Sequence, residues 1–143
     1  MTTNIREIEK GDYDKGHLEL YKQLTHINPE NISRSMYNNF VEKLNESHMI
    51  FVLVHNDSIV GSGTIIIEDK LIRDISRVGH IEDIVVDGNC RGSGYGKKII
   101  EYLIEYSKKM GCYKVILDCS NSNQEFYEKC GLTLNGCQMC KYF

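Results

Sequence analysis

The densest apolar runs of the chain predict its β-strands. Residues 49–54 and 59–67 are strongly apolar, and the turn-forming residues Asn56-Asp57-Ser58 lie between them, so this stretch predicts a β-hairpin. Further apolar runs predict strands at 5–8, 79–86 and 113–119. In the C-terminal tail, alternate positions favour a last strand; they are Cys137, Met139, Lys141 and Phe143.

A period of three to four residues predicts helices in the remaining segments, at 13–24, 33–46 and 97–110, with a shorter helix that ends before Gly131. Gly111 follows the third helix at the position where glycine commonly ends a helix. A charged connector covers residues 68–77. The predicted order is therefore β-α-α-β-β-β-α-β-α-β, which favours an α/β sheet with helices on both faces.

Composition narrows the function classes. A chain of 143 residues with 41% hydrophobic and 26% charged residues suits a single domain, which we place over residues 1–143. The net charge of −3 gives no support for a nucleic-acid partner. The chain has no apolar run of the ~20 residues that a membrane span requires, and its first residues lack a secretory signal. We therefore expect a cytoplasmic protein without a membrane or nucleic-acid partner.

All six cysteines lie in the later part of the chain, from Cys90 to Cys140. Reduced thiols are expected in the cytoplasm. The pair Cys137-x-x-Cys140 has the spacing of half a zinc site, but no second pair matches it, and neighbouring positions of a strand project to opposite faces. We expect no metal site.

The segment Arg91-Gly92-Ser93-Gly94-Tyr95-Gly96 lies between a predicted strand and a predicted helix. Its glycines let the backbone approach an anion closely, because no Cβ intervenes. The helix that follows directs its first N–H groups and its positive dipole end to the same place. Strand, glycine loop and helix together predict a pyrophosphate-binding site.

Other glycine loops fit the segment less well. The phosphate loop G-x-x-x-x-G-K-[ST] is not matched, because Lys98 stands where a hydroxyl is required. The dinucleotide fingerprint G-x-G-x-x-G has a different spacing, although Asp118 lies at a plausible distance downstream, so this alternative stays open. A glycine-rich turn that only caps the helix is the simplest alternative.

The loop resembles the (R/Q)-x-x-G-x-(G/A) loop of the GNAT acetyltransferase superfamily at every defined position. Three further segments are similar to the glucosamine-6-phosphate N-acetyltransferase branch of that superfamily: 79–87, 111–119 and 123–131. The strong similarity covers about residues 79–131, and the first half is more loosely similar. The resemblance implies a mixed, mostly antiparallel sheet flanked by helices on both faces.

The resemblance also implies a reaction and its participants. The amine of D-glucosamine 6-phosphate attacks the thioester of acetyl-CoA directly, without a metal ion, in a step that belongs to UDP-N-acetylglucosamine biosynthesis. The family is a homodimer, in which the C-terminal strand lends a basic residue to the neighbouring site. Here Tyr142 stands at the arginine position, with Lys141 beside it.

The same resemblance implies which residues of this chain form the site. Tyr127 serves the leaving thiolate, Asp118 orients the amine, and Glu82 is the third catalytic residue. The other acetyl-CoA contacts are Ile84, Val85, Val86, Arg91, Gly92, Ser93, Gly94, Tyr95, Gly96 and Asn123. Substrate contacts are expected from Thr25, Lys70, Arg73, Glu82, Asp83, Asp118 and Lys141. Each of these residues also has an ordinary structural reading, such as a packed tyrosine, a helix cap or a solvated charged loop.

The residues themselves support direct transfer. The sequence shows no Ser-His-Asp or Cys-His set, so a covalent route has no obvious nucleophile. Glu82 and Asp83 are neighbours on a predicted strand, so they should point to opposite faces and cannot form a simple carboxylate pair. Two rival functions remain: a GNAT enzyme that acetylates a protein N-terminus, a lysine or a polyamine, and a non-catalytic acyl-CoA-binding module.

Overall fold

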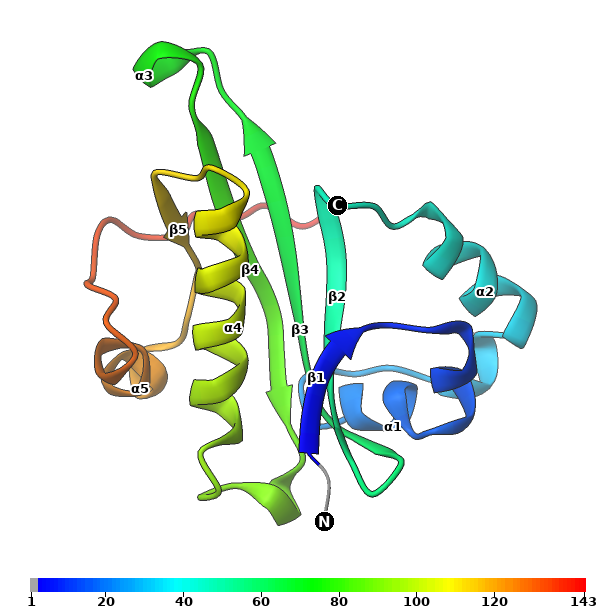
Figure 1. Cartoon of the computed structure of the whole chain (residues 1–143). Helices are drawn as coiled ribbons and strands as arrows, with labels where there is room; N and C mark the ends of the chain where they lie inside the picture. The colour runs from blue at the N-terminus through cyan, green and yellow to red at the C-terminus, as the bar shows by residue number, and fades with distance from the viewer. Residues whose placement is uncertain (1–2) are drawn as a thin grey trace.

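The computed structural model describes residues 3–143 and contains one five-stranded sheet in the order β1-β2-β3-β4-β5 (Figure 1). The strands are β1 (Thr3–Glu7), β2 (His48–His55), β3 (Ser58–Asp69), β4 (Arg77–Val86) and β5 (Lys114–Ile116). Each of the first three strands pairs antiparallel with the next, and only β4 and β5 are parallel. The expectation of a mixed, mostly antiparallel sheet is confirmed.

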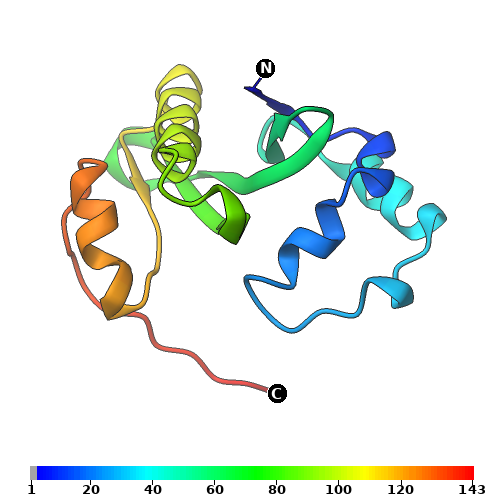
Figure 2. The ribbon, with the colours of Figure 1, turned by 90° about the horizontal axis from the view of Figure 1, so that it is seen from below.

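Helices cover both faces of this sheet, as expected (Figure 2). The helices of the described chain are α1 (His17–Tyr21), α2 (Arg34–Lys43), α4 (Tyr95–Lys109) and α5 (Gln124–Lys129), together with α3 (Ile72–Ile75), which lies at the tip between β3 and β4. Helix α4 packs on β3 and β4 from one side, and α1 packs on β3 from the other. Short 3-10 turns are added at Lys10–Asp14, Pro29–Asn31, Gly88–Cys90 and Asn121–Asn123.

Three predicted elements differ from the structure. The helix expected over 13–24 is divided into a 3-10 turn and the short α1, because Gly16 between them is left-handed, with φ 85°. The strand expected over 113–119 pairs only at Lys114–Ile116. The last predicted strand is wrong, because residues 132–143 form neither a helix nor a strand, and the tail extends past α5 (Figure 2).

Glycines allow α4 to lie close on the sheet. Ile99, Ile100 and Leu103 of this helix are at most 1% exposed, and burying an aliphatic side chain of this size contributes about 1.5–3 kcal/mol. A Cβ on Gly63 of β3 would lie 2.7 Å from Ile84 Cδ1 and within 3.0 Å of atoms of Ile99 and Leu103. The small residues on β3 therefore set the distance between helix and sheet.

A β-bulge interrupts β4 opposite Gly63. Thr64 pairs with Glu82 and Ser62 pairs with Val85, so Asp83 and Ile84 together face a single residue of β3. Asp83 takes the left-handed conformation with φ 51°. Such a bulge bends the strand and changes the direction of its side chains.

Strands β4 and β5 separate soon after they begin to pair. Their register contains only Val78–Lys114, Gly79–Val115 and His80–Ile116. From Ile81 to Val86, β4 has a strand partner on the β3 side alone within the described part of the chain. The separation exposes backbone groups of β4 next to its bulge.

We predict that Gly63→Ala lowers the free energy of unfolding by about 1–3 kcal/mol, the usual effect of overpacking a buried site. The added methyl group meets the buried side chains of Ile99 and Leu103 and the partly buried side chain of Ile84 at once. Urea denaturation measures the change. Gly11→Ala is the matched control, because no heavy atom lies within 4 Å of its added Cβ and its φ is not positive. Equal stability of the two variants would contradict the packing argument.

Candidate active site

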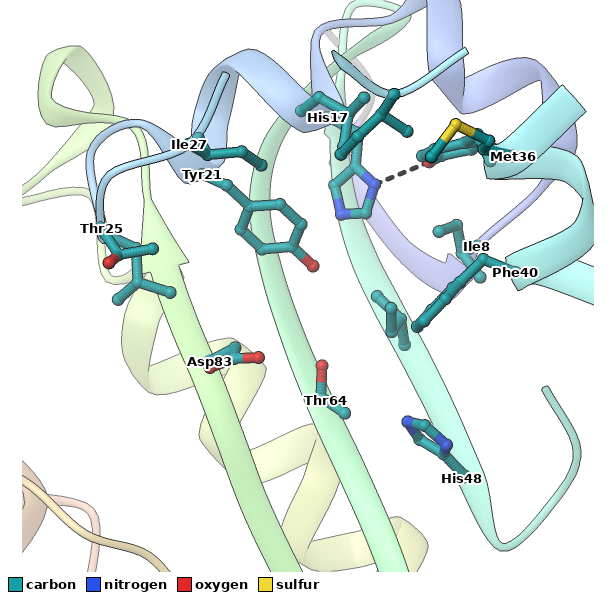
Figure 3. A pocket seen from close by; sticks show the side chains of 15 residues that line it. Ile8, His17, Tyr21, Thr25, Ile27, Met36, Phe40, His48, Thr64 and Asp83 are labelled. Carbon is teal, nitrogen blue, oxygen red and sulfur yellow. Dashed lines mark hydrogen bonds between the residues drawn. The ribbon is translucent and has the colours of Figure 1, made fainter. Parts of the chain in front are cut away.

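The first of two hollows lies between the α1–α2 segment and one face of the sheet. It has a volume of about 440 Å³, and most of its lining is apolar. Leu24, Ile27, Met36 and Phe40 belong to its wall, whereas Thr25, Thr64 and Asp83 place polar groups in it (Figure 3). A mostly apolar concave wall with a few polar groups is typical of a small-molecule site.

A buried polar chain underlies this hollow. His17 Nδ1 lies 2.7 Å from the hydroxyl of Tyr37, and His17 Nε2 lies 3.0 Å from Ser62 Oγ. The Tyr21 hydroxyl lies 3.3 Å from the same Ser62 Oγ. Burial lowers the pKa of His17 to about 4, more than the nearby charge of Asp12 raises it, so the imidazole is neutral at pH 7.

The second hollow, of about 810 Å³, lies where β4 and β5 separate. Its lining includes Glu82, Asp118 and Tyr127, the three predicted catalytic residues, which the fold thus brings to one place. Burial raises the pKa of Glu82, and the negative charges of Asp83 and Asp118 raise it further. Burial also raises the pKa of Tyr127, so its hydroxyl keeps its proton at neutral pH. Gln138 Nε2 donates to Asp118 Oδ2 at 3.0 Å.

The walls of the two hollows adjoin at the bulge of β4. Asp83 lines the first hollow and its neighbour Glu82 lines the second. The two carboxylates therefore serve different hollows, as expected. The reason differs from the simple alternation that the sequence suggested, because the bulge at Asp83 interrupts the regular strand.

The glycine loop leads into α4 as predicted. Gly92 and Gly94 have φ values of 85° and 78°, which favour glycine, and Gly94 is the N-cap of α4. No side-chain hydrogen bond caps this end of the helix, so its first N–H groups have no side-chain acceptor there. A Cβ on Gly96 would lie 3.0 Å from Phe126 Cζ. Gly96 thus allows α5 to pack beside the loop.

The structure does not gather the predicted phosphate ligands with Thr25 and Asp83. Lys70 and Arg73 lie at the tip between β3 and β4, at the opposite end of the molecule from α1 (Figure 1). There Lys70 Nζ lies 3.2 Å from Glu68 Oε1, and the Arg73 guanidinium stacks 4.7 Å above the Tyr113 ring. Lys141 lies in the exposed tail. Asn123 is the N-cap of α5, without a side-chain capping bond.

Sequence reasoning missed three residues of these hollows, namely His17, Tyr21 and His80. His17 and Tyr21 are four residues apart, so they share one face of α1, and a histidine within an apolar helix face was the available signal. His80 lines the second hollow, and its Nε2 lies 2.8 Å from Glu68 Oε1. The side chains of His80 and Glu68 come together only because β3 pairs with β4.

Within residues 3–143 the structure has no helix that is long and apolar enough to span a membrane. The same residues contain no group of three or more side chains arranged to hold a metal ion. All six cysteines are free thiols.

Comparison with known proteins defines the class of this site. The model of the acetyltransferase (GNAT) family matches residues 5–132, so the chain belongs to that family. Its relatives place it in the glucosamine 6-phosphate N-acetyltransferase branch. The chain is 43% identical to the Arabidopsis thaliana protein of this name, over 99% of this chain and 97% of that one. It is 40% identical to the Trypanosoma brucei brucei protein of the same name, over 94% and 92% of the two chains.

Solved structures agree with this assignment. The crystal structure of the Arabidopsis thaliana glucosamine-6-phosphate N-acetyltransferase has a TM-score of 0.95 and 41% identity, and the match covers 100% of this chain and 99% of that chain. A Trypanosoma brucei acetyltransferase has a TM-score of 0.92 and 38% identity, with 99% and 100% covered.

We predict that the bulge makes Asp83 a position where glycine is better tolerated than alanine. A non-glycine residue at positive φ is strained, so Asp83→Gly should be about 1 kcal/mol more stable than Asp83→Ala. The same two substitutions at Glu82 form the control. Glu82 has no positive φ, so its glycine variant should be less stable than its alanine variant. Thermal unfolding of the four variants tests whether the glycine variant is the more stable one at Asp83 and the less stable one at Glu82.

Proposed function

We propose that the protein transfers the acetyl group of acetyl-CoA to the amine of D-glucosamine 6-phosphate. The products are N-acetyl-D-glucosamine 6-phosphate and CoA, and the step serves UDP-N-acetylglucosamine biosynthesis in the cytoplasm. The meeting of two hollows at Glu82 and Asp83 carries this proposal, because a donor and an acceptor can reach one point from opposite sides. The names of the relatives supply the acceptor.

Acetyl-CoA would bind along α4 and the free edge of β4. The loop Arg91–Gly96 and the N-terminus of α4 would hold the pyrophosphate, supported by the left-handed Gly92 and Gly94. The backbone of Ile84, Val85 and Val86 would pair with the pantetheine arm, because no strand within residues 3–143 pairs with that edge. Asn123 is the further candidate contact for the arm.

The residues of the second hollow fit a direct transfer. The amine forms a bond to the thioester carbonyl carbon, and the carbon–sulfur bond breaks as the intermediate collapses. Glu82, with its raised pKa, and Asp118 are placed to orient the amine and to accept its proton. Tyr127 keeps its own proton and donates it to the departing thiolate. Backbone N–H groups near Ile84 would stabilise the oxyanion.

The sugar would occupy the first hollow, with Thr25 and Asp83 as contacts. Its phosphate requires cations, and the candidates Lys70, Arg73 and Lys141 do not reach that hollow within one chain. A homodimer resolves this separation, because a neighbouring subunit can bring its exposed tip or tail to the hollow. Leu71, Ile72 and Met139 are exposed apolar side chains of these two segments, which supports their burial against a second copy.

The rival functions differ in a simple assay. Another GNAT enzyme would release CoA with a protein N-terminus, a lysine or a polyamine, and an acyl-CoA-binding module would release none with any amine. The convergence of Glu82, Asp118 and Tyr127 on one hollow favours chemistry over binding alone. Thiol release with a panel of amines separates the three.

We predict that glucosamine without phosphate is at least ~10²-fold poorer in kcat/KM than its 6-phosphate, because charge-assisted contacts to a dianion are strong. Arg73→Ala should raise the KM of the phosphorylated sugar and narrow this preference. Arg34→Ala is the control, because Arg34 pairs with Asp14 outside both hollows. Steady-state thiol release measures all of these constants. Equal activity on both sugars would refute the substrate.

We predict that Tyr127→Phe lowers kcat by about 10²-fold, the usual size of a general-acid contribution, while the KM of acetyl-CoA changes little. Tyr102→Phe is the matched control, because Tyr102 packs on Phe51 at a distance from the second hollow. If the Tyr127→Phe enzyme has near-normal turnover in the same assay, the Tyr127 hydroxyl does not act as a proton donor and the residue only packs.

A further inference from the structure

The chain buries a histidine under the first hollow although the proposed reaction does not use it. His17 is 1% exposed, and its two hydrogen-bond neighbours, Tyr37 and Ser62, are 5% and 0% exposed. These groups come from α1, α2 and β3. A buried polar group that lacks a partner is costly, so the direction of each hydrogen bond in this chain is constrained.

Counting donors and acceptors favours one direction. Neutral His17 has one N–H and one bare nitrogen. The Tyr37 hydroxyl has His17 Nδ1 at 2.7 Å and no other side-chain or backbone acceptor among the hydrogen bonds of the described residues, so it donates to that nitrogen. The remaining N–H of His17 is then on Nε2, and it donates to Ser62 Oγ at 3.0 Å.

The chain continues to the wall of the hollow. Ser62 has accepted from His17, so its own O–H is free to donate to the Tyr21 hydroxyl oxygen at 3.3 Å. The proton of Tyr21 is then left to point away from Ser62. Figure 3 shows the Tyr21 ring extending from α1 toward Asp83 and Thr64 in this hollow.

Tyr21 and Asp83 therefore offer a donor and an acceptor in one place. Burial raises the pKa of Tyr21, and the charge of Asp83 raises it further, so the phenol stays protonated beside a carboxylate. A ligand hydroxyl suits such a pair, because it can accept from the phenol and donate to the carboxylate. The apolar wall of Leu24, Ile27 and Phe40 suits the C–H faces of a ring.

We propose that Tyr21 is a substrate-binding residue that selects a hydroxylated acceptor by donating to a ring hydroxyl of the amino sugar. His17 and Ser62 are positioning residues that hold the phenol oxygen and leave its proton free for the substrate. The proposal rests on the proposed function and adds to it a specificity contact on the acceptor side.

The first test is Tyr21→Phe in the full-length enzyme. We expect the KM of glucosamine 6-phosphate to rise about 5–10-fold, the loss that corresponds to one neutral hydrogen bond. The KM of acetyl-CoA should stay unchanged, whereas the melting temperature should fall slightly, because the buried Ser62 O–H loses its acceptor. Tyr13→Phe is the matched control. Its hydroxyl donates to the Ile32 carbonyl at 2.9 Å and lies outside the hollow, so its loss should leave the sugar KM unchanged.

A double-mutant cycle separates positioning from simple packing. Ser62→Ala should raise the sugar KM by a smaller factor, and Ser62→Ala should add nothing in the Tyr21→Phe background. The 3-deoxy and 4-deoxy analogues of the sugar provide the second measurement. For one of them the wild-type enzyme and Tyr21→Phe should have the same KM.

The outcomes distinguish this proposal from the function on which it rests. A wild-type enzyme that does not acetylate glucosamine 6-phosphate overturns both. An active wild-type enzyme whose sugar KM is unchanged in Tyr21→Phe overturns the Tyr21 contact alone. The Tyr21 contact is also overturned if the effects of Ser62→Ala and Tyr21→Phe on the sugar KM are additive. The same holds if Tyr21→Phe raises the KM of both deoxy analogues as much as it raises the KM of glucosamine 6-phosphate.

Discussion

The β-bulge in β4 is the constraint on which the rest of the site depends. Two residues, Asp83 and Ile84, face the single Gly63 of β3, and Asp83 accepts a left-handed backbone to make this possible. Helix α4 packs on one face of β3 and β4 through buried side chains. The strand therefore bends within a rigid support, and the bend places Glu82 and Asp83 at the junction of two hollows.

The separation of β4 from β5 is the second consequence of this geometry. Only three residue pairs join the two strands before they separate, and the second hollow lies in the gap. An extended cofactor arm can use the backbone of β4 there without displacing a strand. Gly94 takes the left-handed conformation at the N-cap of α4, where no side chain caps the helix. In the proposed function, donor binding and the catalytic residues thus depend on one departure from regular sheet pairing.

Long periodic elements could be predicted from the sequence, and the details of their interruption could not. The hairpin of β2 and β3, the strand β4 and the helix α4 each carry a strong apolar pattern and were placed within a few residues. The glycine loop could be predicted because its backbone conformation favours glycine, and glycines are visible in the sequence. The bulge leaves no comparable pattern, because a single extra residue is indistinguishable from strand continuation.

The polar chain of His17 and Ser62 joins residues 45 positions apart, which only the fold brings together. The alternation of the tail predicts a strand, but a strand also needs a partner to pair with, and residues 132–143 pair with none of the described strands.

The central claim is that acetyl donor and amine acceptor meet at the bulge and react directly. Initial rates measured over a grid of acetyl-CoA and glucosamine 6-phosphate concentrations test this claim. Direct transfer in a ternary complex predicts double-reciprocal lines that intersect, with no exchange of acetyl groups between acetyl-CoA and labelled CoA in the absence of sugar. Parallel lines together with such an exchange would show an acetylated enzyme and would contradict the account.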